Sequence, residues 1–560
     1  MQFHVGLLNA FLPSFITGTV KALTRKSGDR PKPTPLGPTA YLDGLRGVAA
    51  FVVYIFHYSY LWYPQLRSGY GFDDDNRLFW QRPVVRILHS GRAGVTIFFV
   101  ISGYVLTVKT LTLIHNRKDN QVLGALAGSA FRRPFRLCLP IIASTFVIAL
   151  AVYAGWYLRL PAGYPPPRAD TLRQQLLHWF WSTVDIMNPF LYVDRRNNMR
   201  GSIYNDHLWT IPVEFKGSLL VFVLLLMFAR AKRWIHAAAV IGVAFCLAVY
   251  GDCDQALFAA GLLLAELSIV LPPNPSTAAT LDEALPSHDA PVVHTSGLRN
   301  PNLIRHVVTV TLFLLGLHLM SYPETNGGGA PGFITLSQTV PAYYLNNSDR
   351  TQLFWNSVGS VIFIVALMYS PAASSVPVFT RTAEKLHVLR LKTQDFVGKT
   401  DVFSWAHARF TCVRSWAGLN LPLEKEQLLS TPSAGEKSDV QPLLQRPFTT
   451  RFAQHLGHIS YSLYLFHGAA IHTVAVLWMV PADAAWTQTV KDTEAMVAAG
   501  DRPGADEVWR KGSSAYLHAF VWCTLINTLA LLWVSEVFNR LVDVPAVRFT
   551  RWISKKAWIK

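Results

Sequence analysis

The chain of 560 residues is too long for one ordinary soluble domain, and 51% of its residues are hydrophobic against only 15% charged. This composition excludes a disordered chain, a collagen and a disulfide-rich secreted module. The net charge of +17 would suit nucleic acid, an anionic membrane face or an anionic substrate, but no polar segment carries the basic clusters that nucleic-acid binding requires. An integral membrane protein is therefore the first interpretation.

Ten segments are apolar over about the 20 residues that a membrane-spanning helix needs. The expected fold class is therefore all-α, a polytopic membrane helical bundle of about ten transmembrane helices. In chain order the predicted spans are 46–63, 90–109, 137–157, 208–229, 234–250, 255–272, 304–321, 352–370, 455–480 and 515–538.

Lys and Arg are about twice as frequent in the loops on the side that includes both termini as in the opposite loops. Both termini are therefore expected in the cytosol, and the endoplasmic reticulum or another endomembrane is the expected location. The triplet Asn346-Asn347-Ser348 is a glycosylation motif in a loop that this orientation places on the non-cytosolic side. The sequence thus predicts a multi-pass glycoprotein.

The predicted organisation is a cytosolic tail over 1–40, a membrane domain over 41–548 and a basic tail over 549–560. Two polar stretches, 273–303 and 371–452, are expected to be loop insertions in the membrane domain. The five cysteines are scattered and form neither a metal-type cluster nor a disulfide framework. No metal site and no bound cofactor are predicted.

Ionisable residues inside the predicted spans are the candidates for function, because they are costly in a membrane. Arg46 and His57 lie eleven residues apart in the first span, so steps of about 100° place both on nearly the same helix face, about 16 Å apart. Arg46 would stand near the cytosolic mouth and His57 deep in the bundle. A snorkelling arginine and a structural histidine would give the same pattern.

A basic patch, Arg132-Arg133-Pro134-Phe135-Arg136, stands where the third span is expected to leave the cytosol. This patch binds an anion or, as the alternative, only fixes the orientation of the third span in the membrane. The fourth span opens with His207 and Trp209, and its Glu214 needs a partner inside the membrane.

Further motifs lie in order along the chain. The full set is Arg46 with ten residues then His57, the Gly-Val-x-x-Phe-Phe-x-x-Ser-Gly run ending at Gly103, Arg133-x-x-Arg136 with Pro140, His207-Leu208-Trp209 through Glu214, Ser460-Tyr461 through His467, and, more weakly, Val542-Asp543-Val544-Pro545. Together these motifs resemble the acyltransferase-3 family of multi-pass membrane acyltransferases, especially its filamentous-fungal members. One departure is that Phe215-Lys216-Gly217 stand where the family commonly has a second Glu and Gln.

The resemblance implies transfer of an acyl group, usually acetyl, from acyl-CoA as co-substrate to a hydroxyl group. His57 would be the general base or, alternatively, a transient acyl carrier. Glu214 would orient or stabilise this histidine or bind the acceptor. The residues expected to hold the acyl-CoA phosphates are Arg46, Arg92, Arg133 and Arg136. Those expected to bind the acceptor are His207, Trp209, Tyr461 and His467.

The expected acceptor is a hydroxylated lipophilic metabolite such as a terpenoid or polyketide, with a cell-wall glycan as the alternative. Two other classes of function compete with an acyltransferase. A proton-coupled secondary transporter would use Arg46, His57 and Glu214 as a proton relay. A non-catalytic scaffold would act through the insertion 371–452. Besides acyl-CoA and the acceptor, the expected partner is the lipid bilayer, and no nucleic acid is expected.

Overall fold

A computed structural model describes residues 36–158, 166–188, 202–273, 301–372 and 441–557. These residues form helices and short connections, and they contain isolated β-bridges but no β-strand. The predicted all-α polytopic bundle is thereby confirmed.

Each predicted span lies on a helix, but ten transmembrane helices are not confirmed. Eight described helical segments are long and apolar enough to cross a membrane. Helix α3 (Ala40–Trp62) is not among them, because Arg46, His57 and several tyrosines lower its hydropathy, and α8 (Arg233–Val249) has only 17 residues. The eight segments comprise α4 (Gly91–His115), α5 (Asp119–Tyr153), η4 with α7 (Asp206–Trp209, Thr210–Met227), α9 (Cys253–Val270), α11 (Pro301–Met320), α13 (Ser348–Met368), α17 with α18 (Arg451–Ala470, Val476–Ala498) and α19 with α20 (Arg502–Phe538, Val544–Ala557).

The predicted insertions and tails fall largely outside the described residues. This holds for most of 1–40, 273–303 and 371–452. The two described ends of the last insertion meet in a bridge between Ala372 and Pro442. The predicted C-terminal tail begins inside helix α20, which continues to Ala557.

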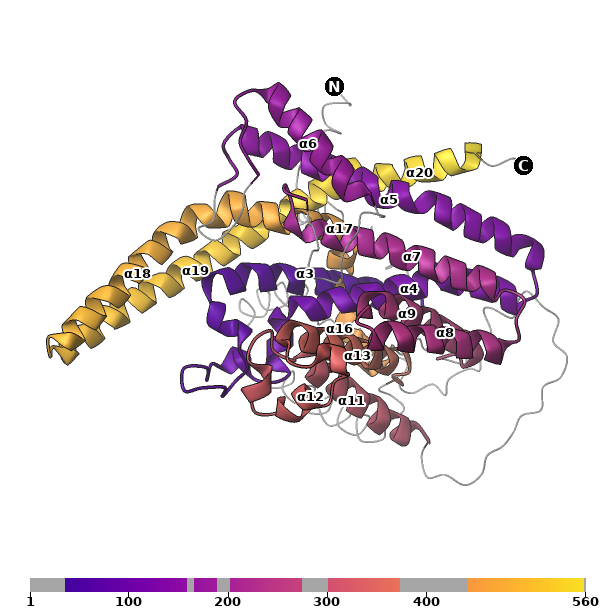
Figure 1. Ribbon diagram of the computed structural model, residues 1–560, viewed down its shortest axis with the longest axis horizontal. Helices are drawn as coiled ribbons and strands as arrows, with labels where there is room; N and C mark the ends of the chain where they lie inside the picture. Colours follow the sequence, from indigo (N-terminus) through magenta and orange to yellow (C-terminus); the bar gives the residue numbers. More distant parts are fainter. Residues whose placement is uncertain (1–35, 159–165, 189–201, 274–300, 373–440, 558–560) are drawn as a thin grey trace, which may run out of the picture.

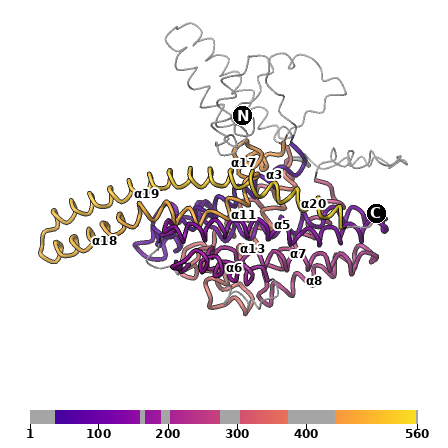
Figure 2. The backbone as a smooth tube through the Cα atoms, turned by 90° about the horizontal axis from the view of Figure 1, so that it is seen from above, coloured from indigo at the N-terminus to yellow at the C-terminus, as the bar shows by residue number. Residues whose placement is uncertain are grey.

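Helix α3 is central because it packs against both α17 and α4. Two long helices, α18 and α19, lie side by side and form an arm that extends beyond the bundle (Figures 1 and 2). Two π-helical segments interrupt the C-terminal helices. The first, η10 (Ile471–Ala475), joins α17 to α18, and the second, η11 (Asn539–Asp543), joins α19 to α20. An additional helix, α6 (Leu172–Met187), packs on α5.

Glycines bring the backbones of α3 and α17 into direct contact. A Cβ atom added to Gly47 would collide with the backbone nitrogen of Gly457 and lie 2.7 Å from the Cβ atom of Leu456. Ten residues further along each helix, the rings of His57 and His467 meet, with centroids 5.2 Å apart. The two helices therefore run parallel, and the glycine contact sets how close their later side chains come.

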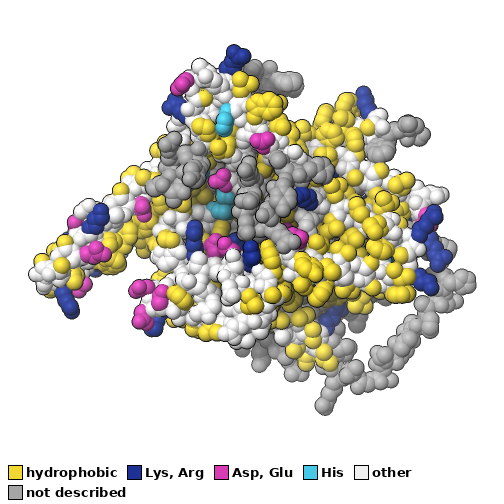
Figure 3. Space-filling model, in the orientation of Figure 1, with side chains coloured by type: hydrophobic (Ala, Val, Ile, Leu, Met, Phe, Trp, Pro, Cys, Tyr) yellow, Lys and Arg dark blue, Asp and Glu magenta, His cyan; other side chains and the backbone are white. Residues whose placement is uncertain are grey.

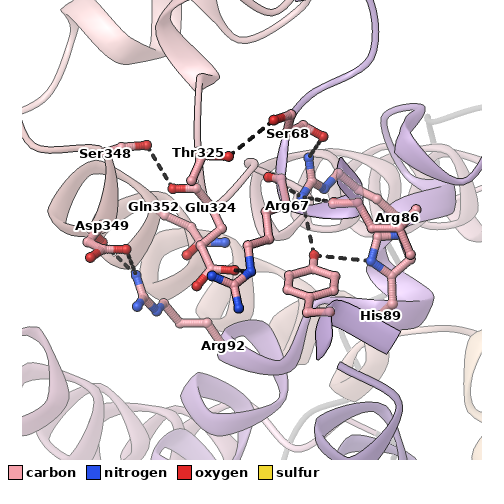
Figure 4. A network of polar contacts seen from close by, with 12 residues as sticks. Arg67, Ser68, Arg86, His89, Arg92, Glu324, Thr325, Ser348, Asp349 and Gln352 are labelled. Atoms are coloured by element: carbon pink, nitrogen blue, oxygen red, sulfur yellow. Dashed lines mark hydrogen bonds and ion pairs between the residues drawn. The ribbon is translucent and has the colours of Figure 1, made fainter. Parts of the chain in front are cut away.

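A polar network joins the loop after α3 to the loop after α11 (Figure 4). Arg86 is fully buried and donates to the backbone oxygen of Ser68 at 3.2 Å. Arg67 lies 4.0 Å from Glu324. Burial lowers the pKa of His89 to about 4, so this ring is neutral at pH 7 and its Nε2 lies 2.8 Å from the oxygen of Trp80. These contacts fix the loops against the ends of the helices.

We expect the variant Gly47→Ala to lower the thermal unfolding temperature of the purified protein, because the new methyl group must push α3 away from α17. Overpacking of this kind costs about 1–3 kcal/mol. Gly242→Ala on α8 is the matched control, since a Cβ atom there meets nothing within 4 Å and alanine favours a helix. Equal unfolding temperatures for the two variants would contradict a close α3–α17 contact.

Candidate active site

A cavity of about 220 Å³ lies between α3, α4, α5, α7, α17 and η11. Its polar lining comes from six separate segments of the chain, which only the folded bundle brings together. Two motifs predicted from the sequence, the first-span arginine and the basic patch, contribute to the same wall. The ionisable and hydroxyl residues that line the cavity are Arg46, Ser102, Arg133, Arg136, Thr210, Glu214, His458, Ser460, Tyr461, Tyr464 and Asp543.

Glu214 finds its partner in Arg133, from another helix. The Nη2 atom of Arg133 lies 2.6 Å from Oε1 of Glu214, and its Nε donates to the hydroxyl of Ser218 at 2.8 Å. Ser102 also donates to Oε1 of Glu214, at 3.0 Å. Among the described residues no hydrogen bond joins Glu214 to His57, so the structure places this carboxylate with the arginines rather than with the histidine.

Arg46 and Arg136 line the same cavity, and no ion pair holds either of them among the described residues. Asp543 is the second carboxylate of the lining. Three guanidinium groups therefore face two carboxylates, and one of these carboxylates is already paired with Arg133. The cavity keeps a positive excess that suits an anionic ligand.

Two tyrosines of α17 line the cavity. The hydroxyl of Tyr464 donates to the backbone oxygen of His207. Because that donation uses its only proton, the contact of 2.7 Å with Thr210 must be a bond that Thr210 donates. The hydroxyl of Tyr461 donates to the backbone oxygen of Leu137 at 2.9 Å.

Three histidines meet next to these tyrosines. The ring centroid of His207 lies 4.0 Å from that of His57 and 4.2 Å from that of His467. His467 is fully buried, whereas the other two are partly exposed. On the face of the molecule in Figure 3, histidine side chains are few, and hydrophobic side chains cover much of the surface.

Gly468 permits this arrangement. A Cβ atom there would lie 2.9 Å from both Cδ2 and Nε2 of the His207 ring. Asn205 fixes the same segment from the other side, because its Nδ2 donates to the backbone oxygen of Leu465 at 2.9 Å. The cluster of His57, His207 and His467 is called the histidine cluster below.

Two of the predicted site residues lie elsewhere. Arg92 does not line the cavity, and its guanidinium donates to the backbone oxygen of Asp349 at 2.8 Å, in the network of Figure 4. Trp209 is partly buried and packs against the core around α4 and α9. The structure therefore separates Arg92 from Arg46, Arg133 and Arg136, with which it was expected to bind the acyl-CoA phosphates.

Sequence reasoning misses other residues of the cavity wall. Tyr464 and Asp543 lie inside motifs that the sequence analysis singles out, so their positions could have drawn attention to them. Asp543 also ends the π-helical segment η11, and such segments are frequent at functional sites. Ser102 and Thr210 also lie inside motifs described above, whereas His458 carries no comparable local signal.

Comparisons with known protein sequences all find acyltransferases. The sequence profile of the acyltransferase domain family matches residues 39–280. The O-acetyltransferase PaAT-1 of Phomopsis amygdali is 26% identical over 84% of this chain and 77% of its own length. An acyltransferase of a Phoma species is 26% identical, over 62% and 79%, and acyltransferase clz18 of Cochliobolus lunatus is 24% identical, over 68% and 87%. No solved structure matches the chain.

We expect Glu214→Gln to destabilise the protein by about 3 kcal/mol, because it leaves the guanidinium of Arg133 buried without its counter-charge. The double variant Arg133→Met with Glu214→Leu should recover most of this loss, since apolar residues replace both charges. Thermal unfolding of the purified variants measures both effects. A single variant as stable as the wild type would show that the pair is not a structural contact.

Proposed function

Because the chain belongs to the acyltransferase-3 family, we propose that this membrane acyltransferase moves an acyl group, most simply acetyl, from acyl-CoA to a hydroxyl group. Family membership favours an enzyme over the transporter and scaffold hypotheses. The observation that carries the proposal is the position of the histidine cluster directly beyond the cavity that Arg46, Arg133 and Arg136 line.

The positive excess of the cavity supports acyl-CoA as the donor. The phosphates of CoA are anionic, and the guanidinium groups of Arg46 and Arg136 lack ion-pair partners among the described residues. The pantetheine arm joins these phosphates to the thioester. Along α3, Arg46 and His57 are separated by about 16 Å, so an arm that follows this face brings the thioester to the histidine.

The proposed reaction needs one proton acceptor. The hydroxyl oxygen of the acceptor attacks the thioester carbonyl carbon while a neutral His57 takes the hydroxyl proton. The tetrahedral intermediate then expels CoA as a thiolate, which takes the proton back from the imidazolium, so an ester and free CoA result. Transient acylation of His57 is the alternative route. His207, His467 and Tyr461 would position the acceptor.

A hydroxylated lipophilic metabolite, such as a terpenoid or polyketide, is the proposed acceptor. An apolar cavity of about 550 Å³ between α5, α17, η10 and α19 supports this choice. Phe466, which lines it, precedes His467 directly in the chain, and Ala469, also in the lining, follows two residues after His467. A glycan acceptor remains the alternative, but the apolar lining of this cavity offers few hydrogen-bond partners to a polar sugar.

We place both termini in the cytosol of an endomembrane such as the endoplasmic reticulum, in agreement with the distribution of Lys and Arg. Glycosylation at Asn346 would fit this orientation. Labelling of single cysteines from each side of the membrane tests it. Positions 345 and 551 should label from opposite sides, and labelling from one side only would reject the orientation.

The function is tested with membranes, radiolabelled acetyl-CoA and a panel of hydroxylated terpenoids, polyketides and glycans. We expect label in an ester of a lipophilic acceptor. His57→Gln should lower the rate by about 10²-fold or more, since glutamine keeps volume and polarity but cannot act as base. His518→Gln is the control, because His518 is exposed on α19.

Near-normal turnover by His57→Gln would end the proposed role of this residue. If no member of the panel receives label and acetyl-CoA is not hydrolysed either, acetyl-CoA is not the acyl donor. A covalent acyl label on the wild-type protein that hydroxylamine removes, and that is lost in His57→Gln, would distinguish the acyl-carrier route from general-base catalysis.

A further inference from the structure

The histidine cluster has a second chemical capacity besides accepting a proton. One ligand nitrogen from each of His57, His207 and His467 lies within 4.8 Å of the others. Among the described residues this is the one group of histidine, cysteine and acidic side chains with such spacing. The three rings come from α3, η4 and α17, so the packing of separate helices converges them.

The orientation of His467 shows where a ligand would sit. Its Nδ1 lies 2.6 Å from the backbone oxygen of Tyr464, and a carbonyl accepts only, so Nδ1 carries the proton. Nε2 therefore has a free lone pair, and this atom is buried with no hydrogen-bond partner among the described residues. A histidine whose other nitrogen donates to a backbone carbonyl is the usual form of a metal ligand.

The remaining contacts of the cluster also favour a cation between the rings. Ring centroids 4.0–5.2 Å apart would repel one another strongly if all three rings were protonated. Neutral rings present lone pairs instead, and no hydrogen bond joins two of these three rings in the described part of the chain. A metal ion would satisfy all the converging nitrogens at once.

We propose that His57, His207 and His467 form a binding site for a transition metal ion of the zinc type. Three imidazoles without cysteine or carboxylate suit Zn²⁺, Co²⁺ or Cu²⁺ rather than Mg²⁺ or Ca²⁺. Tetrahedral zinc holds such nitrogens about 3.3 Å apart, from bonds of about 2.0–2.1 Å, so the rings close inward on binding. A fourth position stays open to a water molecule or substrate oxygen.

The site has a consequence for activity that rests on the proposed function. A metal ion uses the lone pair with which His57 would accept the acceptor's proton. Metal binding and general-base catalysis by His57 therefore exclude each other. Bound Zn²⁺ should thus inhibit acyl transfer by occupying His57.

The test measures metal binding and needs no acyl transfer. The full-length chain, purified in detergent with a tag free of histidine and stripped of metal with EDTA, is titrated with Co²⁺. We expect one Co²⁺ per chain, with the intense visible absorption of a tetrahedral ion, and its displacement by Zn²⁺. His467→Gln and His207→Gln should each weaken binding by about tenfold or more.

His236→Gln and His472→Gln are the controls. His236 belongs to a separate buried group, 3.8 Å from Glu266, and Nδ1 of His472 lies 3.1 Å from the backbone oxygen of Leu158. Both should bind Co²⁺ as the wild type does, and size-exclusion elution shows whether each variant is folded. No Co²⁺ absorption, or equal binding by folded His467→Gln, would overturn the proposal. Failure of acyl transfer alone would leave this result unaffected.

Discussion

The structure of the site depends on the backbone contact between α3 and α17. Glycines at positions 47 and 457 let the two parallel helices approach without intervening side chains. Each helix carries a histidine ten residues further on, and these rings then face each other. A larger separation would open the histidine cluster and also widen the adjoining cavity, which both helices line. The contact therefore sets the geometry of the cavity and of the histidine cluster together.

Buried charge is the second constraint. A carboxylate and a guanidinium inside a membrane bundle are costly unless they meet, and Glu214 meets Arg133 at 2.6 Å. This pair uses the charge of one arginine, and Arg46 and Arg136 share the cavity lining with the one remaining carboxylate, Asp543. The lining therefore keeps an excess of one positive charge, which suits an anionic ligand.

Local periodicity predicts much of this arrangement. Apolar segments of sufficient length give the helices, and spacing along one helix places Arg46 and His57 on one face. The resemblance to a known family adds Arg133, Arg136 and His467. Features of a single helix can be predicted from the sequence because helical geometry is fixed.

Contacts between helices far apart in the chain cannot be predicted from periodicity along one helix. The partner of Glu214 could not be chosen from the sequence, since several basic residues were available, and Arg92 was grouped with a cavity that it does not line. The histidine cluster draws on three segments far apart in the chain, so the spacing of residues along the sequence does not indicate it. Ten spans are likewise not confirmed, because α3 and α8 fall short of the hydropathy or length of the eight described segments that could cross a membrane.

The most direct test of the central claim is a cryo-electron microscopy structure of the full-length protein with CoA bound. The account predicts that the CoA phosphates contact Arg46 and Arg136, and that the pantetheine thiol ends beside His57. CoA phosphates bound instead at Arg67 and Arg92, in the network of Figure 4, would contradict it.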